Sequence, residues 1–278
     1  MQAKAHMILA DLHTHSKFSD GKLTIPELVD FYGSRGFGCI AVTDHICEEK
    51  SFFGRAASYL GRTLTPATFP LYIEILKSEA NRAWDRYKML VIPGFELTKN
   101  SLYNHRSAHI LGLGVNQYMA ADADVVTLAR QIRAQGALAI AAHPVSTRKM
   151  EPQTHHLWSR RQELASELDA WEVASGPILF EEVRKSGLPM IATSDLHHPR
   201  QINAWKTILH CERHPEAVLE AIRQQKLEFK FYKEAVTDSA HLHSTSLVTG
   251  FHSLFNDTLV DSLGNMAGRS TLQKSSAS

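Results

Sequence analysis

Short apolar runs alternate with longer segments of helical periodicity along most of the chain. The short runs are rich in β-branched side chains, which is typical of buried strands. The longer segments place apolar residues three and four positions apart, which predicts helices that pack one face against the strands. We expect strands at residues 7–12, 38–43, 89–93, 107–114, 137–142, 169–174, 189–193 and 205–211.

Capping residues mark where the predicted helices begin and end. Thr24-Ile25-Pro26-Glu27 is a capping box with an early proline, and it predicts a helix that runs to Gly36. Asp124 precedes another periodic segment, which ends at Gly136. Further helices are expected at residues 70–88, 157–167, 177–187 and 215–225. Alternating strands and helices predict an α/β fold with a mostly parallel sheet, and their number favours a closed or distorted barrel over an open sheet.

The chain is long enough for one large domain, and its composition changes near the C-terminus. It has 278 residues, which allow a sizeable core. From about Val236 onward, serine, threonine, asparagine and glycine dominate and charged residues become sparse. We therefore expect one structural domain at residues 1–235 and a polar, flexible tail at residues 236–278.

Charge and cysteine content exclude several classes of protein. The net charge is +1, so no overall field favours nucleic acid or a membrane surface. No stretch approaches the roughly 18–20 apolar residues of a membrane span, and the N-terminus lacks the pattern of a signal peptide. The three cysteines are scattered and form neither a disulfide framework nor a CxxC metal site. A reducing cytoplasm is the expected location.

Histidine and acidic side chains recur at the ends of the predicted strands. Imidazole and carboxylate are the ligands that zinc, manganese and iron prefer. Strand ends in an α/β barrel meet at one mouth, so donors at many strand ends predict a metal cluster. The candidate ligands are His13, His15, Asp20, His45, Glu96, His109, His143, Asp195 and His197.

Each of these residues alone has a plainer explanation, such as a surface histidine or a salt-bridged strand end. His13-Thr14-His15 gains weight because residues two apart on a strand point to one side. Gly21 permits a tight turn that can bring Asp20 back toward the same place. Glu96, if buried, needs a cation or a hydrogen-bonding partner, and its two oxygens can bridge two metal ions. The prediction rests on the whole series.

The series resembles the pattern of the PHP (polymerase and histidinol phosphatase) family. The order His-x-His, Asp-Gly, Thr-Asp-His, Glu, His, His-Pro and Ser-Asp-x-His spans residues 8–200. This resemblance implies a distorted (β/α)7 TIM-like barrel that hydrolyses phosphoesters with two or three divalent metal ions (manganese, zinc or iron). It implies a first ion on His13, His15, Glu96 and Asp195, a second on Glu96, His109 and His143, and a third on Asp20, His45 and His197.

Catalytic and substrate-binding roles follow from the same resemblance and from position in the sequence. We expect Asp44 and His197 to take part in catalysis, with Asp44 orienting a metal ligand. Paired metals would lower the pKa of a bound water and supply hydroxide near neutral pH. Lys17, Arg106 and Arg148 lie close in sequence to predicted ligands, and we expect them to bind the substrate phosphate.

The expected substrate is a small phosphomonoester, either a nucleotide or a sugar phosphate, and several alternatives stay open. Histidinol phosphate would need the same ligands. A short oligonucleotide could be held by the basic segment 148–161. Similar metal centres hydrolyse C–N bonds in amidohydrolases, and a noncatalytic metal-bound module is a further alternative. Ile46 stands where an acid often follows Thr-Asp-His in family members that resemble nucleotide phosphatases, so the subgroup is left open.

Overall fold

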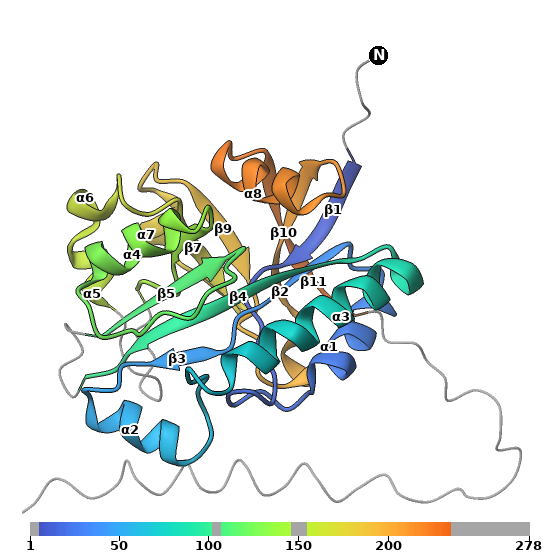
Figure 1. Cartoon of the computed structure of the whole chain (residues 1–278). Coiled ribbons are helices and arrows are strands. Elements are labelled where there is room, and N and C mark those ends of the chain that lie inside the picture. The colour runs from blue at the N-terminus through green and yellow to red at the C-terminus, as the bar shows by residue number, and fades with distance from the viewer. Residues whose placement is uncertain (1–5, 102–106, 146–154, 235–278) are drawn as a thin grey trace, which may run out of the picture. The chain divides into compact units, whose positions relative to one another are not determined.

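A computed structural model describes residues 6–101, 107–145 and 155–234 (Figure 1). The strands are β1 (His6–Asp11), β2 (Cys39–Val42), β3 (His45–Cys47), β4 (Leu90–Lys99), β5 (Ala108–Leu113), β6 (Leu138–Ala141), β7 (Ala170–Ser175), β8 (Ile178–Leu179), β9 (Met190–Thr193), β10 (Ala204–Cys211) and β11 (Leu227–Tyr232). The helices are α1 (Ile25–Gly33), α2 (Phe52–Tyr59), α3 (Phe69–Tyr87), α4 (Val125–Ala134), α5 (His155–Ser159), α6 (Arg161–Leu164), α7 (Glu181–Arg184), α8 (Pro215–Arg223) and the 3-10 helix η2 (Pro199–Ile202).

All the predicted strands are present, but the sheet is mixed and not mostly parallel. The sheet has 11 strands in the order β11-β10-β1-β2-β4-β5-β6-β7-β8, with β3 beside β4 and β9 beside β7. β5 runs antiparallel to β4 and β6, and β10 runs antiparallel to β1. A parallel crossover needs a dozen or more residues, and the stretch between Lys99 and Ala108 is too short for one.

Two predicted helical segments do not form continuous helices, and neither α2 nor η2 was predicted. The segment 157–167 is divided between α5 and α6, because Arg160 leaves the helical region with φ −105° and ψ 16°. The segment 177–187 first forms β8, which pairs with the end of β7, and only then the short α7. α2 begins after Ser51, whose side chain accepts a hydrogen bond from the backbone N–H of Gly54.

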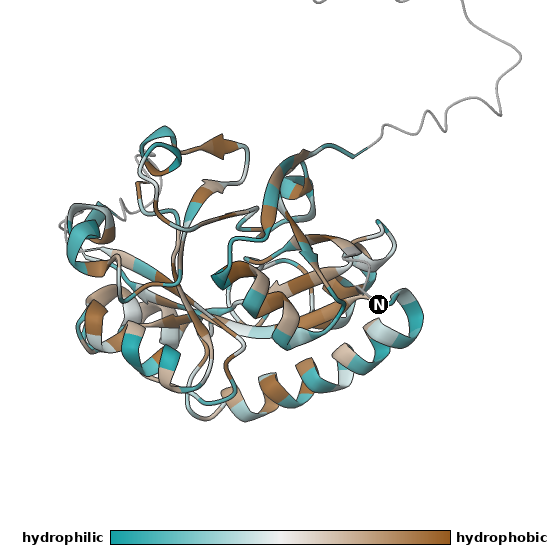
Figure 2. Ribbon diagram, turned by 90° about the horizontal axis from the view of Figure 1, so that it is seen from above, coloured by the Kyte–Doolittle hydropathy of each residue, from teal (hydrophilic) through white to brown (hydrophobic). Residues whose placement is uncertain are grey.

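Side chains on opposite faces of the strands pack into two apolar layers. Ile40 belongs to the same buried cluster as the apolar faces of α1, α3 and α4, whereas Ala41 belongs to a second cluster in the interior of the curled sheet. α8 adds Val218 and Ile222 to that inner layer. Figure 1 shows α1 and α3 side by side along one face. In Figure 2 the strands are largely hydrophobic, whereas the helices carry both kinds of residue.

A threonine side chain forms a seam between two described strands of the curled sheet, β9 and β10, that do not pair with each other. Thr207 on β10 donates its Oγ1 hydrogen to the carbonyl of Ala192 on β9 (2.8 Å) and accepts from the N–H of the same residue (3.0 Å). Backbone pairing between β9 and β10 is absent from the described strands. The expected distorted barrel is therefore confirmed, with hydrogen-bonded strands around most of its wall and a side-chain contact at this seam.

Three further predictions concern membrane spans, the cysteines and the C-terminal tail. Within the described ranges, no helix is long and apolar enough to cross a lipid bilayer. Cys39, Cys47 and Cys211 are free thiols. The tail expected at residues 236–278 lies outside the described residues.

The substitution Thr207→Val tests the closure of the barrel. It replaces the buried hydroxyl with a methyl group of similar size and leaves both backbone groups of Ala192 without this partner. We expect the free energy of unfolding to fall by about 1–3 kcal/mol, measured by urea denaturation followed by circular dichroism. Thr207→Ser, which keeps the hydroxyl, should lose less. A Thr207→Val protein as stable as the wild type would show that the seam does not depend on this contact.

Candidate metal centre

Most of the predicted ligands follow the carboxyl ends of parallel strands, which meet at one edge of the barrel. His13 and His15 follow β1, and His45 follows β2 as the first residue of β3. His143 follows β6, and His197 follows β9. The carboxyl ends of parallel strands lie at the same edge of a sheet, so the backbones that carry these five imidazoles lie near one another.

Glu96 and His109 reach the same edge by a different route. The pattern placed Glu96 at a strand end, but β4 continues to Lys99, so Glu96 lies within the strand. His109 is the second residue of β5 and lies opposite Thr98 of β4. Because β5 is antiparallel to its neighbours, its first residues lie where the parallel strands end. The direction of β5 therefore brings His109 to the cluster.

The predicted ligands form three overlapping groups of donors. Within each group, one donor atom from every member lies within 4.8 Å of the others. Asp195 lies beside the first group, with Oδ1 3.3 Å from His13 Nε2 and 3.2 Å from His15 Nε2. The groups are His13, His15 and Glu96; Glu96, His109 and His143; and His15, Asp20, His45 and His197.

Glu96 connects these groups through its two carboxylate oxygens. Oε1 lies 2.8 Å from His109 Nδ1 and 3.2 Å from His143 Nε2. Oε2 lies 2.8 Å from His45 Nδ1 and 3.5 Å from His13 Nε2. The side chain is fully buried. Its two oxygens therefore face different sets of imidazoles, which is the arrangement of a carboxylate that can bridge two ions.

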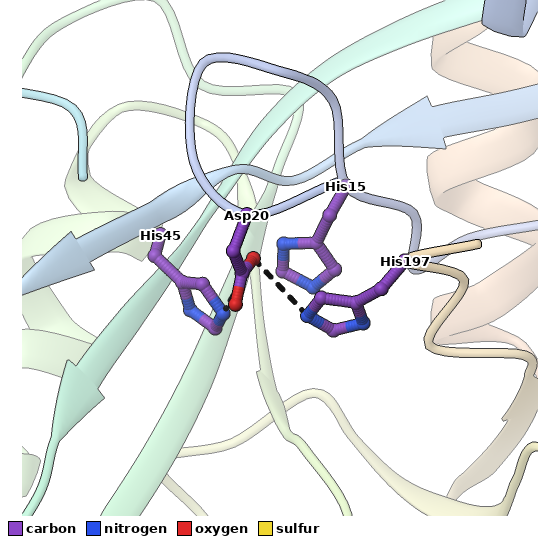
Figure 3. A group of neighbouring side chains, drawn as sticks. All are labelled: His15, Asp20, His45 and His197. Carbon is purple, nitrogen blue, oxygen red and sulfur yellow. Dashed lines mark ion pairs between the residues drawn. The ribbon is translucent and has the colours of Figure 1, made fainter. Parts of the chain in front are cut away.

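The third group depends on a tight turn after β1. Figure 3 shows Asp20 between two imidazoles, with Oδ1 3.5 Å from His45 Nε2 and 3.2 Å from His197 Nε2. The ring of His15 stacks on that of His197 at 4.1 Å between centroids. At Gly21 a Cβ atom would lie 2.2 Å from the carbonyl oxygen of His15. Only glycine permits this close approach, which returns Asp20 to the site.

Three buried oxygens of the cluster have no hydrogen-bond donor among the described residues. They are Asp20 Oδ1, Glu96 Oε2 and Asp195 Oδ1. Imidazole nitrogens lie near each of them, but not at hydrogen-bonding angles, and no described lysine or arginine forms an ion pair with these carboxylates. Buried anionic oxygens without donors are costly, and a divalent cation among them would remove this cost. The residues present therefore fit divalent metal ions.

The charges of the imidazoles follow from their neighbours. Burial, together with the adjacent rings of His197 and His45, lowers the pKa of His15 to about 3, so this ring is neutral and offers a lone pair. Burial also disfavours the charged form of His197, but the carboxylates of Asp195 and Asp20 outweigh it and raise that pKa to about 10. Protons on some imidazoles thus balance the carboxylates, and divalent ions can take their place.

Glu172, which the sequence analysis missed, orients two of the candidate ligands. It lies fully buried in β7. Its Oε1 accepts hydrogen bonds from His13 Nδ1 (2.8 Å) and from the Thr193 hydroxyl (2.6 Å), which leaves Nε2 of His13 turned to the cluster. Its Oε2 accepts from the backbone N–H of His143 (2.6 Å), a residue in the left-handed region with φ 28°. An acidic residue between apolar neighbours in a strand was the available signal.

Asp44 organises the first loop and does not line the cavity at the cluster. Its carboxylate accepts hydrogen bonds from the N–H and the hydroxyl of Ser16 (2.8 and 2.6 Å) and from the Ser19 hydroxyl (2.6 Å). Ser19 Oγ in turn lies 3.5 Å from His15 Nδ1. Asp44 therefore reaches His15 through Ser19, and the orienting role expected for it stays a prediction.

A cavity of about 600 Å³ opens over the cluster and carries two arginines in its lining. Arg62 follows α2, and Arg200 belongs to η2. Both side chains are exposed, and neither guanidinium has a hydrogen-bond or ion-pair partner among the described residues. Arg200 lies three residues beyond His197, so its position in the sequence was a usable signal. Arg62 lies next to α2, which was not predicted.

Of the three predicted phosphate-binding residues, the structure describes Lys17, and Lys17 does not line the cavity. Lys17 lies in a separate hollow with Phe18, and its Nζ is 3.8 Å from Glu27 Oε2. The loop that turns Asp20 inward leaves the Lys17 side chain outside the cavity lining. Arg106 and Arg148 lie outside the described residues.

Comparisons with known proteins agree with this architecture. The family model for the PHP domain matches residues 11–134. A two-domain protein from Bacteroides vulgatus ATCC 8482, described as containing a predicted PHP-like metal-dependent phosphoesterase, is 22% identical with a TM-score of 0.61. The alignment covers 82% of this chain and 66% of that protein, so this chain spans just under two thirds of it.

A second solved structure has a similar fold. PsfC from Pseudomonas syringae PB-5123 is 16% identical with a TM-score of 0.50, and the alignment covers 82% of this chain and 92% of that one. No curated protein is significantly similar in sequence. The ligand series, the curled barrel and the match over residues 11–134 lead to one conclusion: residues 11–134 match a PHP domain, and the fold is a PHP-like distorted barrel.

Proposed function

We propose that this protein is a metal-dependent phosphoesterase whose substrate is a small phosphomonoester, either a nucleotide or a sugar phosphate. One observation supports this most strongly: three buried carboxylate oxygens lie at a cavity whose lining also carries two guanidinium groups, and among the described residues the oxygens have no hydrogen-bond donor and the guanidinium groups have no partner. The carboxylates suit divalent cations, and the guanidinium groups suit an anion. A phosphate group can bind both to the metal ions and to the guanidinium groups.

The chain's own residues prepare the site for this chemistry. Bound divalent ions would lower the pKa of a coordinated water and offset the charge on the phosphoryl oxygens. Glu172 fixes the ring of His13, and Asp44 fixes the loop that carries Asp20. His197 is the most open imidazole of the cluster, with 28% of its side chain exposed, so it is best placed to contact the leaving group. The ions would be held by His13, His15, Asp20, His45, Glu96, His109, His143, Asp195 and His197.

Features of the cavity favour a small substrate over the alternatives. A volume of about 600 Å³ suits a small molecule. In the basic segment 148–161, Arg160 forms a bidentate ion pair with Glu163 (2.6 and 2.9 Å), which reduces the positive charge available to an oligonucleotide. Assays with bis-p-nitrophenyl phosphate, p-nitroacetanilide and histidinol phosphate separate the diesterase, amidohydrolase and histidinol phosphatase alternatives. Faster hydrolysis of the diester or the anilide than of p-nitrophenyl phosphate would contradict the proposal.

Metal content tests the cluster directly. Protein reconstituted with Mn²⁺ and then desalted at pH 7.5 should retain at least two ions per chain by elemental analysis. Ligand imidazoles must be unprotonated, so the retained metal should decrease as the pH falls from about 7 to about 5. Fewer than two ions per chain at pH 7.5, or retention that does not change with pH, would contradict the assignment.

Removal of single ligands should abolish most activity without unfolding the protein. His143→Ala and Asp195→Asn should each reduce the turnover of p-nitrophenyl phosphate with Mn²⁺ by about 100-fold or more, because each change deletes or weakens a metal ligand. His210→Ala is the matched control, since His210 lies on β10 and pairs with Glu228 at 3.7 Å. Turnover like that of the wild type in either ligand variant would refute its role.

Arg200 should act on substrate binding more than on turnover. Arg200→Ala removes a guanidinium from the cavity lining, so the KM for p-nitrophenyl phosphate should rise about tenfold while kcat changes less. Arg200→Lys, which keeps the charge but not the planar fork, should be intermediate. Arg184→Ala is the matched control, because Arg184 is exposed on α7 and pairs with Glu181. An unchanged KM in Arg200→Ala would exclude Arg200 from the binding site.

A further inference from the structure

A buried lysine–aspartate pair lies behind the metal centre, in residues that none of the ligand motifs includes. Lys206 on β10 and Asp11 at the end of β1 are both fully buried, and Lys206 Nζ lies 2.7 Å from Asp11 Oδ2. Within the described residues, this carboxylate is the one group that Lys206 Nζ pairs with. A buried ion pair is often no more stabilising than apolar side chains of the same volume. Its presence therefore points to a role other than stability.

The other contacts of Asp11 show what the pair holds. Asp11 Oδ2 accepts hydrogen bonds from the Tyr32 hydroxyl (2.6 Å) and from the Ser194 hydroxyl (2.5 Å). Asp11 Oδ1 accepts from the backbone N–H of Ser194 (3.1 Å). The Asp11 carboxylate thus accepts hydrogen bonds from both the backbone N–H and the side-chain hydroxyl of Ser194. It joins the end of β1, which precedes His13, to the residue that precedes Asp195.

The residue after Ser194 needs such support. Asp195 has φ 52°, a left-handed conformation that L-residues seldom adopt. On its other side, the N–H of Leu196 donates to the carbonyl of His13 (3.3 Å), and the N–H of His15 donates to the carbonyl of Leu196 (2.9 Å). Held from both sides, Asp195 directs Oδ1 to within 3.3 Å of the Nε2 atoms of His13 and His15.

We propose that Lys206, Asp11, Tyr32 and Ser194 form a positioning network that holds Asp195 in the conformation needed to share a metal ion with His13 and His15. Asp11 supplies the acceptors, and Lys206 fixes the direction in which the Asp11 carboxylate points. These four side chains are positioning residues, since each acts through the backbone of Ser194 or through Asp11. The inference rests on the proposed function only in taking Asp195 as a metal ligand.

The test compares two substitutions in the network with one at a nearby seam. Ser194→Ala removes one donor to Asp11, and Lys206→Met removes the charge at similar length. Thr207→Val is the matched control, because it also removes a buried hydroxyl between β9 and β10 but touches Ala192 and not Ser194. For the full chain, we would measure Mn²⁺ affinity by titration calorimetry, the visible spectrum with Co²⁺, and the melting temperature of the metal-free protein.

If the network acts as proposed, substitutions within it should weaken metal binding, whereas the control substitution should lower only the stability. Ser194→Ala and Lys206→Met should weaken Mn²⁺ binding by about tenfold or more and alter the Co²⁺ spectrum. Thr207→Val should lower the melting temperature while leaving both metal readouts unchanged. Ser194→Ala, the milder change, decides the matter if Lys206→Met does not fold. Wild-type affinity in Ser194→Ala, or an equal loss of affinity in Thr207→Val, would overturn the inference.

The outcome is distinguishable from failure of the proposed function. If the wild type binds Mn²⁺ but hydrolyses no phosphoester, the proposed function fails, and weakened binding in Ser194→Ala would still support the network. If the wild type is active and both network variants bind Mn²⁺ and Co²⁺ as it does, the network fails and the proposed function stands.

Discussion

Buried carboxylate oxygens without hydrogen-bond donors are the constraint on which the rest of this structure depends. Glu96, Asp195 and Asp20 each direct such an oxygen at imidazole nitrogens and at no fixed cation among the described residues. A protein interior does not tolerate unbalanced anionic charge unless protons or metal ions offset it. The donor set therefore explains both the shifted pKa values of the cluster and its fitness for divalent ions.

Surrounding polar contacts hold this arrangement in place at some conformational cost. Two candidate ligands, His143 and Asp195, have positive φ values of 28° and 52°. Backbone strain of this kind costs about 1–3 kcal/mol per residue and persists where neighbouring contacts enforce it. Glu172 bonds to the backbone N–H of His143, and Asp11 bonds to that of Ser194. Each strained residue thus has a hydrogen bond to a buried carboxylate, donated by its own backbone N–H or by that of the preceding residue, as expected at a functional site.

Local spacing was sufficient to predict which histidines and acids lie together, because most of them follow directly after an apolar run in the sequence. The alternation of strands placed His13, His143 and Asp195 at one edge, and Gly21 indicated the turn that returns Asp20. The supporting carboxylate Glu172 was not predictable in this way, since its partner His13 lies 159 residues away in the sequence. The mixed sheet was missed because alternation alone carries no information on strand direction. Helix α2 and the adjacent Arg62 were missed because that segment lacks a clear apolar period.

A crystal structure of the Mn²⁺-reconstituted protein, with anomalous data collected at the manganese edge, tests the central claim most directly. The account predicts at least two anomalous peaks, with one or more lying about 2.0–2.3 Å from an oxygen of Glu96 and others within the same reach of Asp195 or Asp20. Peaks located elsewhere, or a fully reconstituted crystal with no peak at Glu96, would contradict it.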